Sequence, residues 1–463
     1  METHSTETRI EKTAPSFETL TLPSYGEILR FAIPLALGLV TNAVNTLIDT
    51  LFIGQLGTAQ LAAVPLAAIL YFCGWVLIAG ILRNSIAFMG RAFGAKDFSK
   101  IGVVLAHYQF LALLGLPLLA LFIQSWPLLS EIATLDAVVD NHAWVYLKIR
   151  FWDALFSLLF VLYSSFYQAL GNSRLPMLVA FGILLTNVVL DYGLIFGHFG
   201  LPALGVAGSA LATVLANALG ASVIILTSFL SKTRMTFNLR VFIPLDWQLL
   251  KNILRIGIPQ AVGDCLEILT WLGLFLIVGQ LGQVALAANN IGIQVTHLLF
   301  LPGAAMGTAA ASYMARFLGT DRPDIAQTTT YRILKIGMIY MGVLGIPLWF
   351  FGESIARWFT TDEAVIYQAG LMFKVMALFQ VFDAMVMILR SALGGAKDTL
   401  VPTLLLVGCA VGVMFPTAFF LSRLLEPGLV GAWVGAFAYL LILAIVMRYR
   451  FQSVIRYPLS VIP

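Results

Sequence analysis

The amino-acid sequence predicts an all-α polytopic membrane protein with twelve transmembrane helices in two parallel six-helix repeats. Of its 463 residues, 60% are hydrophobic and only 11% are charged, whereas about a quarter of the residues in a soluble domain carry a charge. Apolar runs of about 20 residues recur along the chain, and each is long enough to cross the ~30 Å hydrocarbon core as a helix. The second half of the sequence also repeats the first at a nearly constant offset.

The apolar stretches are continuous rather than alternating, which favours helices over strands. We expect membrane spans at residues 30–53, 62–88, 103–125, 145–169, 175–197, 205–230, 253–279, 284–312, 331–351, 365–391, 400–421 and 429–448. Because this number of spans is even, both ends of the chain are expected on the same side of the membrane.

The basic residues indicate which side that is. Most of the 27 Lys and Arg residues fall in the N-terminal tail, the connections after even-numbered spans and the C-terminal tail, with Arg91, Arg174, Arg390 and Lys397 among them. The positive-inside rule places this side, and both termini, in the cytoplasm. The first 23 residues are polar and lack the apolar segment of a signal peptide. The net charge of +4 requires no nucleic-acid partner.

The internal repeat defines two lobes. Pro34 matches Pro259 at an offset of 225 residues, and "GVAG" at Gly205 matches "GLVG" at Gly428 at an offset of 223. Parallel two-bundle repeats suit alternating access, in which the bundles rock about a central site. We therefore expect a cytoplasmic tail at 1–25, a six-helix lobe at 26–230, a cytoplasmic linker at 231–250, a second lobe at 251–450 and a tail at 451–463.

The sequence offers little for an enzyme. Its cysteines, Cys73, Cys265 and Cys409, fall in apolar segments at unrelated positions and predict neither a disulfide nor a metal site. No glycine-rich phosphate loop and no nucleophile with a nearby base is present. We therefore expect no enzymatic activity and no cofactor beyond a coupling ion.

Four polar residues mark a candidate cation site in the first lobe. Asn187 and Asp191 are four residues apart and share a helix face. The helical rise puts Asp49 and Asp191 roughly 24–28 Å from the cytoplasmic ends of their helices, and Thr213 about 12 Å in from the outside. These groups can therefore meet in the outer half of the bilayer. The alternative for Asp49 is a cap or a snorkelling side chain at the outer interface.

Carboxylate, amide and hydroxyl oxygens together suit a hard cation such as Na⁺. Without a metal, the pair Asp49 and Asp191 would share a proton, since two like charges at close range repel. Pro34 interrupts the hydrogen-bond ladder of the helix that carries Asp49, and a bendable helix would tie cation binding to a change of shape. Elsewhere, Asp153 follows Arg150 by three positions, a spacing typical of a local ion pair.

A second set of polar residues lies in the second lobe. Asp264 and Glu267 are three residues apart on one helix, Asn290 and Gln294 share a face of the next, and Asp383 lies on a third. Ionisable residues in a membrane segment are expensive and usually functional. They predict a cation or substrate site, and the alternative is an internal polar network that holds the helices together.

The order of short motifs resembles one family. "IDTLFIGQLGTAQLAA", "QALGNSRLPM", "NVVLDYGLIFG" and "SALGGAKDTLVPTL" are similar to segments of the multidrug and toxic compound extrusion (MATE) transporters, over essentially the whole chain after residue 25. The acid in "LDYGLIFG" looks like the DinF-like branch, whereas Glu267 and the "FDA" around Asp383 look like NorM-type members. The resemblance implies twelve helices in two lobes around a central cavity, in a bacterial inner membrane.

The resemblance also implies roles for these residues. Asp49, Asn187, Asp191 and Thr213 would hold the coupling cation, Na⁺ or H⁺, and Glu267 and Asp383 would bind an ion or a cationic substrate. An apolar, polarizable cavity lined by aromatic and methionine side chains attracts organic cations. Its candidates are Trp271, Phe275, Met376 and Phe379, for which packing in the core or against lipid is the alternative.

The function that follows is secondary active export of amphipathic organic cations, coupled by antiport to Na⁺ or H⁺ entry. A flippase for a lipid-linked precursor of the same superfamily is the alternative, and the mostly acidic charges at bilayer depth disfavour it, since a pyrophosphate needs cations. A channel or a receptor sits poorly with the two-lobe repeat. The expected partners are small organic cations and the lipid bilayer, and a two-lobe transporter is expected to be a monomer.

Overall fold

The structure is a computed structural model of the chain, and it describes residues 21–230, 232–239 and 244–456. Residues 1–20 and 457–463 of the expected tails, and residues 231 and 240–243 of the expected linker, lie outside the described part. No strand occurs in the described residues.

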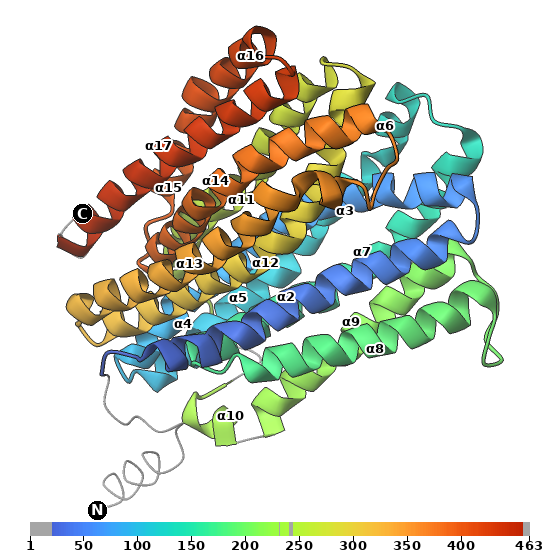
Figure 1. The fold of residues 1–463 in the computed structure, drawn as a ribbon. Coiled ribbons are helices and arrows are strands. Elements are labelled where there is room, and N and C mark those ends of the chain that lie inside the picture. Colours follow the sequence, from blue (N-terminus) through green and yellow to red (C-terminus); the bar gives the residue numbers. More distant parts are fainter. Residues whose placement is uncertain (1–20, 231, 240–243, 457–463) are drawn as a thin grey trace, which may run out of the picture. The chain divides into compact units, whose positions relative to one another are not determined.

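Each of the twelve predicted spans is helical (Figure 1). The helices are α2 (Tyr25–Gly54), α3 (Thr58–Arg83), α4 (Ser85–Gly94), α5 (Phe98–Gln124), α6 (Trp126–Ile132), α7 (Ala137–Ala169), α8 (Arg174–Phe196), α9 (Val206–Leu230), α10 (Lys232–Thr236), α11 (Trp247–Gly279), α12 (Gln283–Gly319), α13 (Pro323–Ala356), α14 (Glu363–Gly395), α15 (Leu400–Cys409), the π-helix η1 (Ala410–Met414), α16 (Phe415–Leu424) and α17 (Gly428–Arg456).

Most of these helices are long and apolar enough to cross a membrane. In the described residues, ten spans meet that description, and α12 makes eleven if its two parts, bent by 41°, count as one span. The remaining predicted span, 145–169, corresponds to α7, which carries Lys148, Arg150 and Asp153 along its length. The protein is therefore a multi-pass membrane protein.

The span at 400–421 contains an irregular turn. Helix α15 ends at Cys409, the π-helix η1 follows, and α16 begins at Phe415. Pro416 has no N–H to donate to the Gly412 carbonyl in the preceding turn. One residue further on, Thr417 Oγ1 donates to the Val413 carbonyl at 2.6 Å. A single widened π-turn accommodates this gap in the backbone hydrogen bonds.

The chain divides into two compact units. Unit 1 contains Leu37–Ala261 and Ala315–Asp321, whereas unit 2 contains Ser24–Ala36, Val262–Met314 and the chain from Arg322 onward. The boundaries therefore fall inside α2, α11 and α12 and just before α13, rather than in the linker at 231–250. The predicted lobes, 26–230 and 251–450, describe the sequence repeat and stay a prediction.

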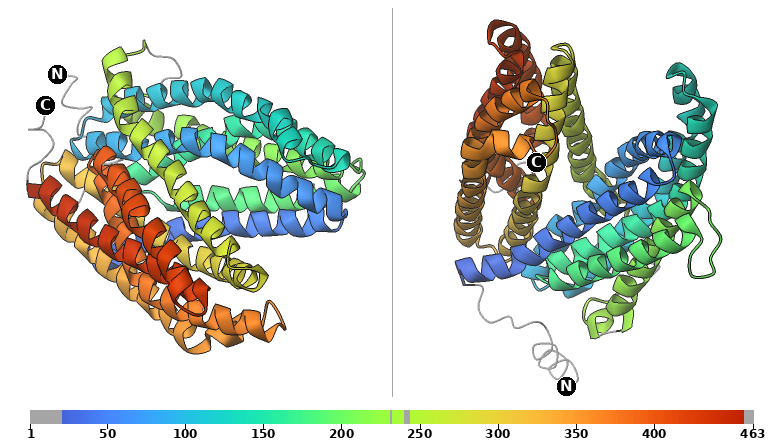
Figure 2. Two further views of the ribbon diagram at one scale, coloured as in Figure 1. Left: turned by 90° about the horizontal axis from the view of Figure 1, so that it is seen from above. Right: turned by 45° about the vertical axis from the view of Figure 1, so that its right-hand side comes forward.

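The core of unit 1 forms around α7. This helix packs against α3 and α9, and α8 lies beside α9 (Figures 1 and 2). Apolar residues recur on one face of α7 at intervals of four or seven, and each is fully buried: Ala143, Leu147, Ala154, Leu158 and Leu162. This spacing is typical of an amphipathic helix with one face in the core.

The core of unit 2 likewise forms around one long helix, α14. Helix α14 packs between α13 and α17, and α16 packs against α17. The fully buried residues of α14 include Met372, Phe373, Met376 and Phe379. The large side chains of α14 thus fill the centre of this unit.

The repeated glycine motif has the same structural role in both units. A Cβ atom on Gly208 of α9 would lie 2.6 Å from the Leu194 carbonyl carbon of α8. A Cβ atom on Gly431, which is 223 positions later, would lie 2.7 Å from the Ser422 backbone nitrogen of α16. Real Cβ atoms do not approach backbone this closely, so each glycine lets the final helix of its repeat touch the preceding one.

Gly208→Ala should therefore destabilise the protein. The added methyl group meets backbone rather than a flexible side chain, and overpacking of this kind costs about 1–3 kcal/mol. The unfolding temperature of the purified protein in detergent would measure the loss. Gly182→Ala is the matched control, because a Cβ atom at this helical glycine of α8 would meet nothing within 4 Å. Equal unfolding temperatures for the two variants would contradict the packing argument.

Candidate functional site

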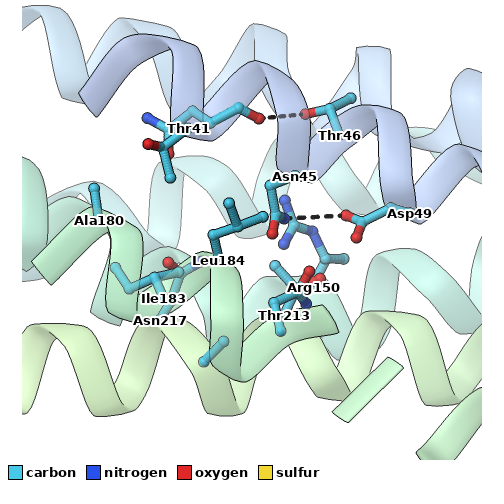
Figure 3. A pocket seen from close by; sticks show the side chains of 13 residues that line it. Thr41, Asn45, Thr46, Asp49, Arg150, Ala180, Ile183, Leu184, Thr213 and Asn217 are labelled. Atoms are coloured by element: carbon cyan, nitrogen blue, oxygen red, sulfur yellow. Dashed lines mark hydrogen bonds between the residues drawn. The ribbon is translucent and has the colours of Figure 1, made fainter. Parts of the chain in front are cut away.

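A polar pocket of about 160 Å³ lies among four helices of unit 1 (Figure 3). Its lining includes Asn45 and Asp49 from α2, Arg150 from α7, Asn187 from α8, and Thr213 and Asn217 from α9. The volume has room for several water molecules. Three of the four residues predicted for the cation site therefore line one pocket, and the fourth, Asp191, contacts them from α8.

The two carboxyl groups of the predicted site lie together. Asp49 and Asp191 both lie within hydrogen-bonding distance of the Asn187 amide nitrogen, and Asp191 is fully buried. Two ionised carboxylates at this range repel, so a proton or a cation is needed between them. Asp191 Oδ1 receives no hydrogen bond from any described residue, which leaves this oxygen free for that role.

Asn187 connects these groups. With its amide nitrogen turned toward the acids, Asn187 donates to Asp49 Oδ1 at 2.9 Å and to Asp191 Oδ2 at 3.1 Å, and its carbonyl oxygen accepts from the Thr213 backbone N–H at 3.3 Å. Asn45 Nδ2 donates to Asp49 Oδ2 from the same helix, at 3.4 Å. The amide therefore holds α2, α8 and α9 to one another at the level of the acids.

The donor set decides which cation the residues fit. The Thr213 hydroxyl donates to the Ser209 carbonyl at 3.0 Å, so its oxygen is left to accept or to coordinate. In this arrangement Asn187 presents its N–H rather than its oxygen to the carboxyl pair, which suits a shared proton. Na⁺ would use the oxygens of Asp49, Asp191 and Thr213, with the Asn187 oxygen available only after the amide turns. No group of three or more His, Cys, Asp or Glu in the described chain forms a metal site.

A second buried carboxylate lies behind the pocket. Asp153 accepts from Tyr71 Oη at 2.9 Å and from Asn217 Nδ2 at 2.6 Å. The ion pair with Arg150 predicted from the spacing is confirmed, with 3.1 Å between Arg150 Nη1 and Asp153 Oδ2. The Arg150 guanidinium also lies 4.8 Å from the centroid of the Tyr71 ring. Asp153 thus fixes a cation at the edge of the pocket.

In unit 2, one arginine holds both acids of α11. Arg390 of α14 donates through Nη2 to Asp264 Oδ1 at 2.8 Å and through Nη1 to Glu267 Oε2. Arg390 was predicted to be one of the basic residues of the cytoplasmic side, whereas its side chain is only 12% exposed and faces these acids. Asp383 is buried two turns earlier on α14 and interacts electrostatically with Glu267.

The amide of α12 that is buried differs from the predicted pair. Asn290 and Gln294 are exposed, whereas the adjacent Asn289 is buried and accepts a hydrogen bond from Trp433 Nε1 at 3.0 Å. The assignment of Asn290 and Gln294 to a cation site stays a prediction, and Asn289 is the amide that sequence analysis missed.

The predicted cavity residues gather around Trp433. Phe379 stacks on Trp433 with ring centroids 5.7 Å apart, and Trp271 lies 6.2 Å from the same ring. Met376 is fully buried and accepts from Thr296 Oγ1 at 3.5 Å, whereas Phe275 is partly exposed. In this structure Met376 and Phe379 pack in the core of unit 2, and a cavity role for the four residues stays a prediction.

Many membrane transporters are built from internal helical repeats, and their binding sites contain polar residues between the helices. The MatE family model matches residues 34–193 and 259–420 of this chain, so the chain belongs to the MatE family. The two matched segments begin 225 residues apart (259 − 34), which is the offset of the repeat.

Curated relatives agree over most of their length. The chain is 29% identical over 459 residues to the multidrug resistance protein NorM of Burkholderia vietnamiensis, covering 97% of each chain. It is 28% identical over 417 residues to the probable multidrug resistance protein NorM of Thermotoga maritima, covering 89% of each.

Solved structures show the same fold. An outward-facing multidrug resistance MATE family transporter of the MOP superfamily has a TM-score of 0.83 and 21% identity, covering 93% of this chain and 96% of that one. A MOP superfamily transporter from Pyrococcus furiosus has a TM-score of 0.84, also at 21% identity, with the same coverage.

Tyr71→Phe should destabilise unit 1. The substitution removes one of the donors to a buried carboxylate, and leaving such a group short of a partner costs about 1–3 kcal/mol. Thermal unfolding in detergent would measure the loss. Tyr367→Phe is the control, because Tyr367 is 55% exposed. If both variants unfold at the wild-type temperature, the Tyr71 hydroxyl contributes nothing to holding Asp153.

Proposed function

We propose that this protein is a secondary active exporter of amphipathic organic cations, driven by entry of Na⁺ or H⁺. The observation that carries the proposal is that Asp49, which lines the pocket of unit 1, and Asp191, which lies beside it, are joined through the Asn187 amide. Membership of the MatE family and relatives named as multidrug resistance proteins support it.

The carboxyl pair would couple a cation to the shape of α2. Without a cation, Asp49 and Asp191 repel each other, and with a proton or Na⁺ between them they are drawn together. Asp49 lies on α2, which begins in unit 2 and continues into unit 1. Pro34 leaves one carbonyl of α2 without its helical hydrogen bond, just before the boundary at Ala36. A cation that binds one bend of α2 more tightly shifts the balance of transporter states toward it.

The setting follows from the basic residues and the relatives. We place both termini in the cytoplasm, on the positive-inside rule, and the protein in the bacterial inner membrane, where a proton or sodium gradient is available. Substrates would be organic cations attracted by acids and aromatic faces. A monomer carries both repeats and is sufficient for alternating access.

Asp191→Asn should abolish coupled export while the protein still folds. The amide keeps the size of the side chain but neither ionises nor binds a proton or Na⁺ in the same way. Efflux of tetraphenylphosphonium from inverted vesicles, normalised to protein level, would measure the effect. Asp324→Asn is the control, since its carboxylate is exposed at the start of α13. Wild-type efflux from the Asp191 variant would remove the site from the mechanism.

Imposed gradients should identify the coupling ion. In proteoliposomes given either a Na⁺ or an H⁺ gradient, we expect one gradient to drive tetraphenylphosphonium export, and Asp49→Asn to abolish that dependence. Liposomes without protein give the leak rate. Export at equal rates with and without a gradient would mean that the protein is a channel or facilitator instead.

A further inference from the structure

The acids of unit 2 are already occupied by a cation that belongs to the chain. The Arg390 guanidinium bridges two carboxylates, Asp264 through Nη2 at 2.8 Å and Glu267 through Nη1. Planar guanidinium groups match carboxylates in this two-armed way and form strong, charge-assisted hydrogen bonds. The acids that the sequence points to as a cation site are therefore partners of Arg390 in this structure.

The local backbone is shaped for this arginine. A Cβ atom at Gly263, next to Asp264, would lie 3.0 Å from Arg390 Nη2 and 2.5 Å from Thr403 Oγ1. Any larger residue at this position of α11 would push against the guanidinium or the threonine. Gly263 thus leaves the room that Arg390 needs to reach across from α14.

The charges around Arg390 are not balanced. Arg390 carries one positive charge, whereas Asp264, Glu267 and the nearby Asp383 would carry three negative charges if all were ionised. The three side chains of the bridge also differ in access. Arg390 is 12% exposed, Asp264 17% and Glu267 34%, so Glu267 is the carboxylate that a second cation reaches most easily.

We propose that Arg390 is a tethered competitor of the transported cation: an organic cation displaces its guanidinium from Glu267, while Asp264 keeps hold of it. This proposal rests on the proposed export of organic cations and assigns the exchange to unit 2. Because Arg390 is attached to α14, it remains at high effective concentration near Glu267. The return of Arg390 to Glu267 would then expel the organic cation. The cation would therefore bind more weakly, and leave faster, than it would at Asp264 and Glu267 without Arg390.

The first test is cation binding by the purified full-length protein, measured by calorimetry with tetraphenylphosphonium. Arg390→Met removes the competitor but keeps an unbranched side chain, and it should bind the probe at least tenfold more tightly. Its maximal export rate in proteoliposomes should fall, because release becomes slow. Arg390→Lys retains a tethered cation and should stay close to the wild type in both measurements.

Arg450→Met is the matched control. Arg450 forms a comparable buried ion pair in unit 2, with 2.7 Å between its Nε and Asp398 Oδ2. The same substitution at Arg450 also removes a buried ion pair, but it leaves one carboxylate, Asp398, rather than two. Probe affinity should therefore not change. Unchanged or weaker binding by Arg390→Met, with Arg450→Met at the wild-type value, would overturn the proposal.

Glu267→Gln keeps the proposal testable if loss of Arg390 prevents folding. Arg390 would remain paired with Asp264, but the exchangeable carboxylate would be gone, so probe affinity should fall at least tenfold. Wild-type affinity in this variant would also overturn the proposal. Failure of the proposed function would give a different result. Efflux would then be independent of any ion gradient, and the Asp191→Asn variant would export at the wild-type rate, whatever the binding data show.

Discussion

A carboxylate buried among apolar helices must meet a donor, a cation or a proton, and both units are arranged around that requirement. In unit 1, Asp153 is satisfied by Tyr71, Asn217 and Arg150. In contrast, Asp49 and Asp191 face each other with an amide between them. Asp153 has its partners within the chain, whereas Asp49 and Asp191 share the Asn187 amide, with Arg150 in the lining of the same pocket, and leave room for a proton or a cation from outside. The difference separates a structural acid from one suited to coupling.

The two repeats share their packing but not their charges. Gly208 and Gly431 make the same close helix contact, 223 positions apart. At the same offset, however, Asp191 corresponds to Met414, a fully buried residue at the end of the π-helix. Glu267 corresponds, 225 positions earlier, to Asn42. Duplication thus supplies a scaffold of helices, and each copy holds different polar chemistry at matching positions.

Local patterns in the sequence predict much of this structure. Apolar runs predicted every span as a helix, and the spacing of Asn187 and Asp191, with a depth argument, predicted their meeting with Asp49 and Thr213. Partners on distant helices were harder to foresee. Arg390 and Asp264 are 126 residues apart, and no periodicity links them. Arg390 lies at the end of its predicted span, where the sequence does not distinguish an arginine in a loop from an arginine buried between helices.

Adjacent residues of a helix point in different directions, which limits what the sequence alone predicts. Successive residues of an α-helix are about 100° apart, so the face predicted from Asn290 misses Asn289, although the two are adjacent. Trp433 was not singled out, because the sequence around a tryptophan in an apolar run does not show which side chains it contacts. Its contacts with Phe379, Trp271 and Asn289 arise from three other helices.

The division of α2 and α11 between the units bears on how the chain is made. Unit 2 needs Ser24–Ala36, which leave the ribosome first, and unit 1 needs Ala315–Asp321, which emerge after most of the polypeptide has been synthesised. Unit 1 has all its parts only when residue 321 has been made, and by then Ser24–Ala36 and Val262–Met314 of unit 2 have also been made. We therefore expect the early helices of both units to enter the bilayer as incomplete bundles, and unit 1 to be completed only after α12 has been made.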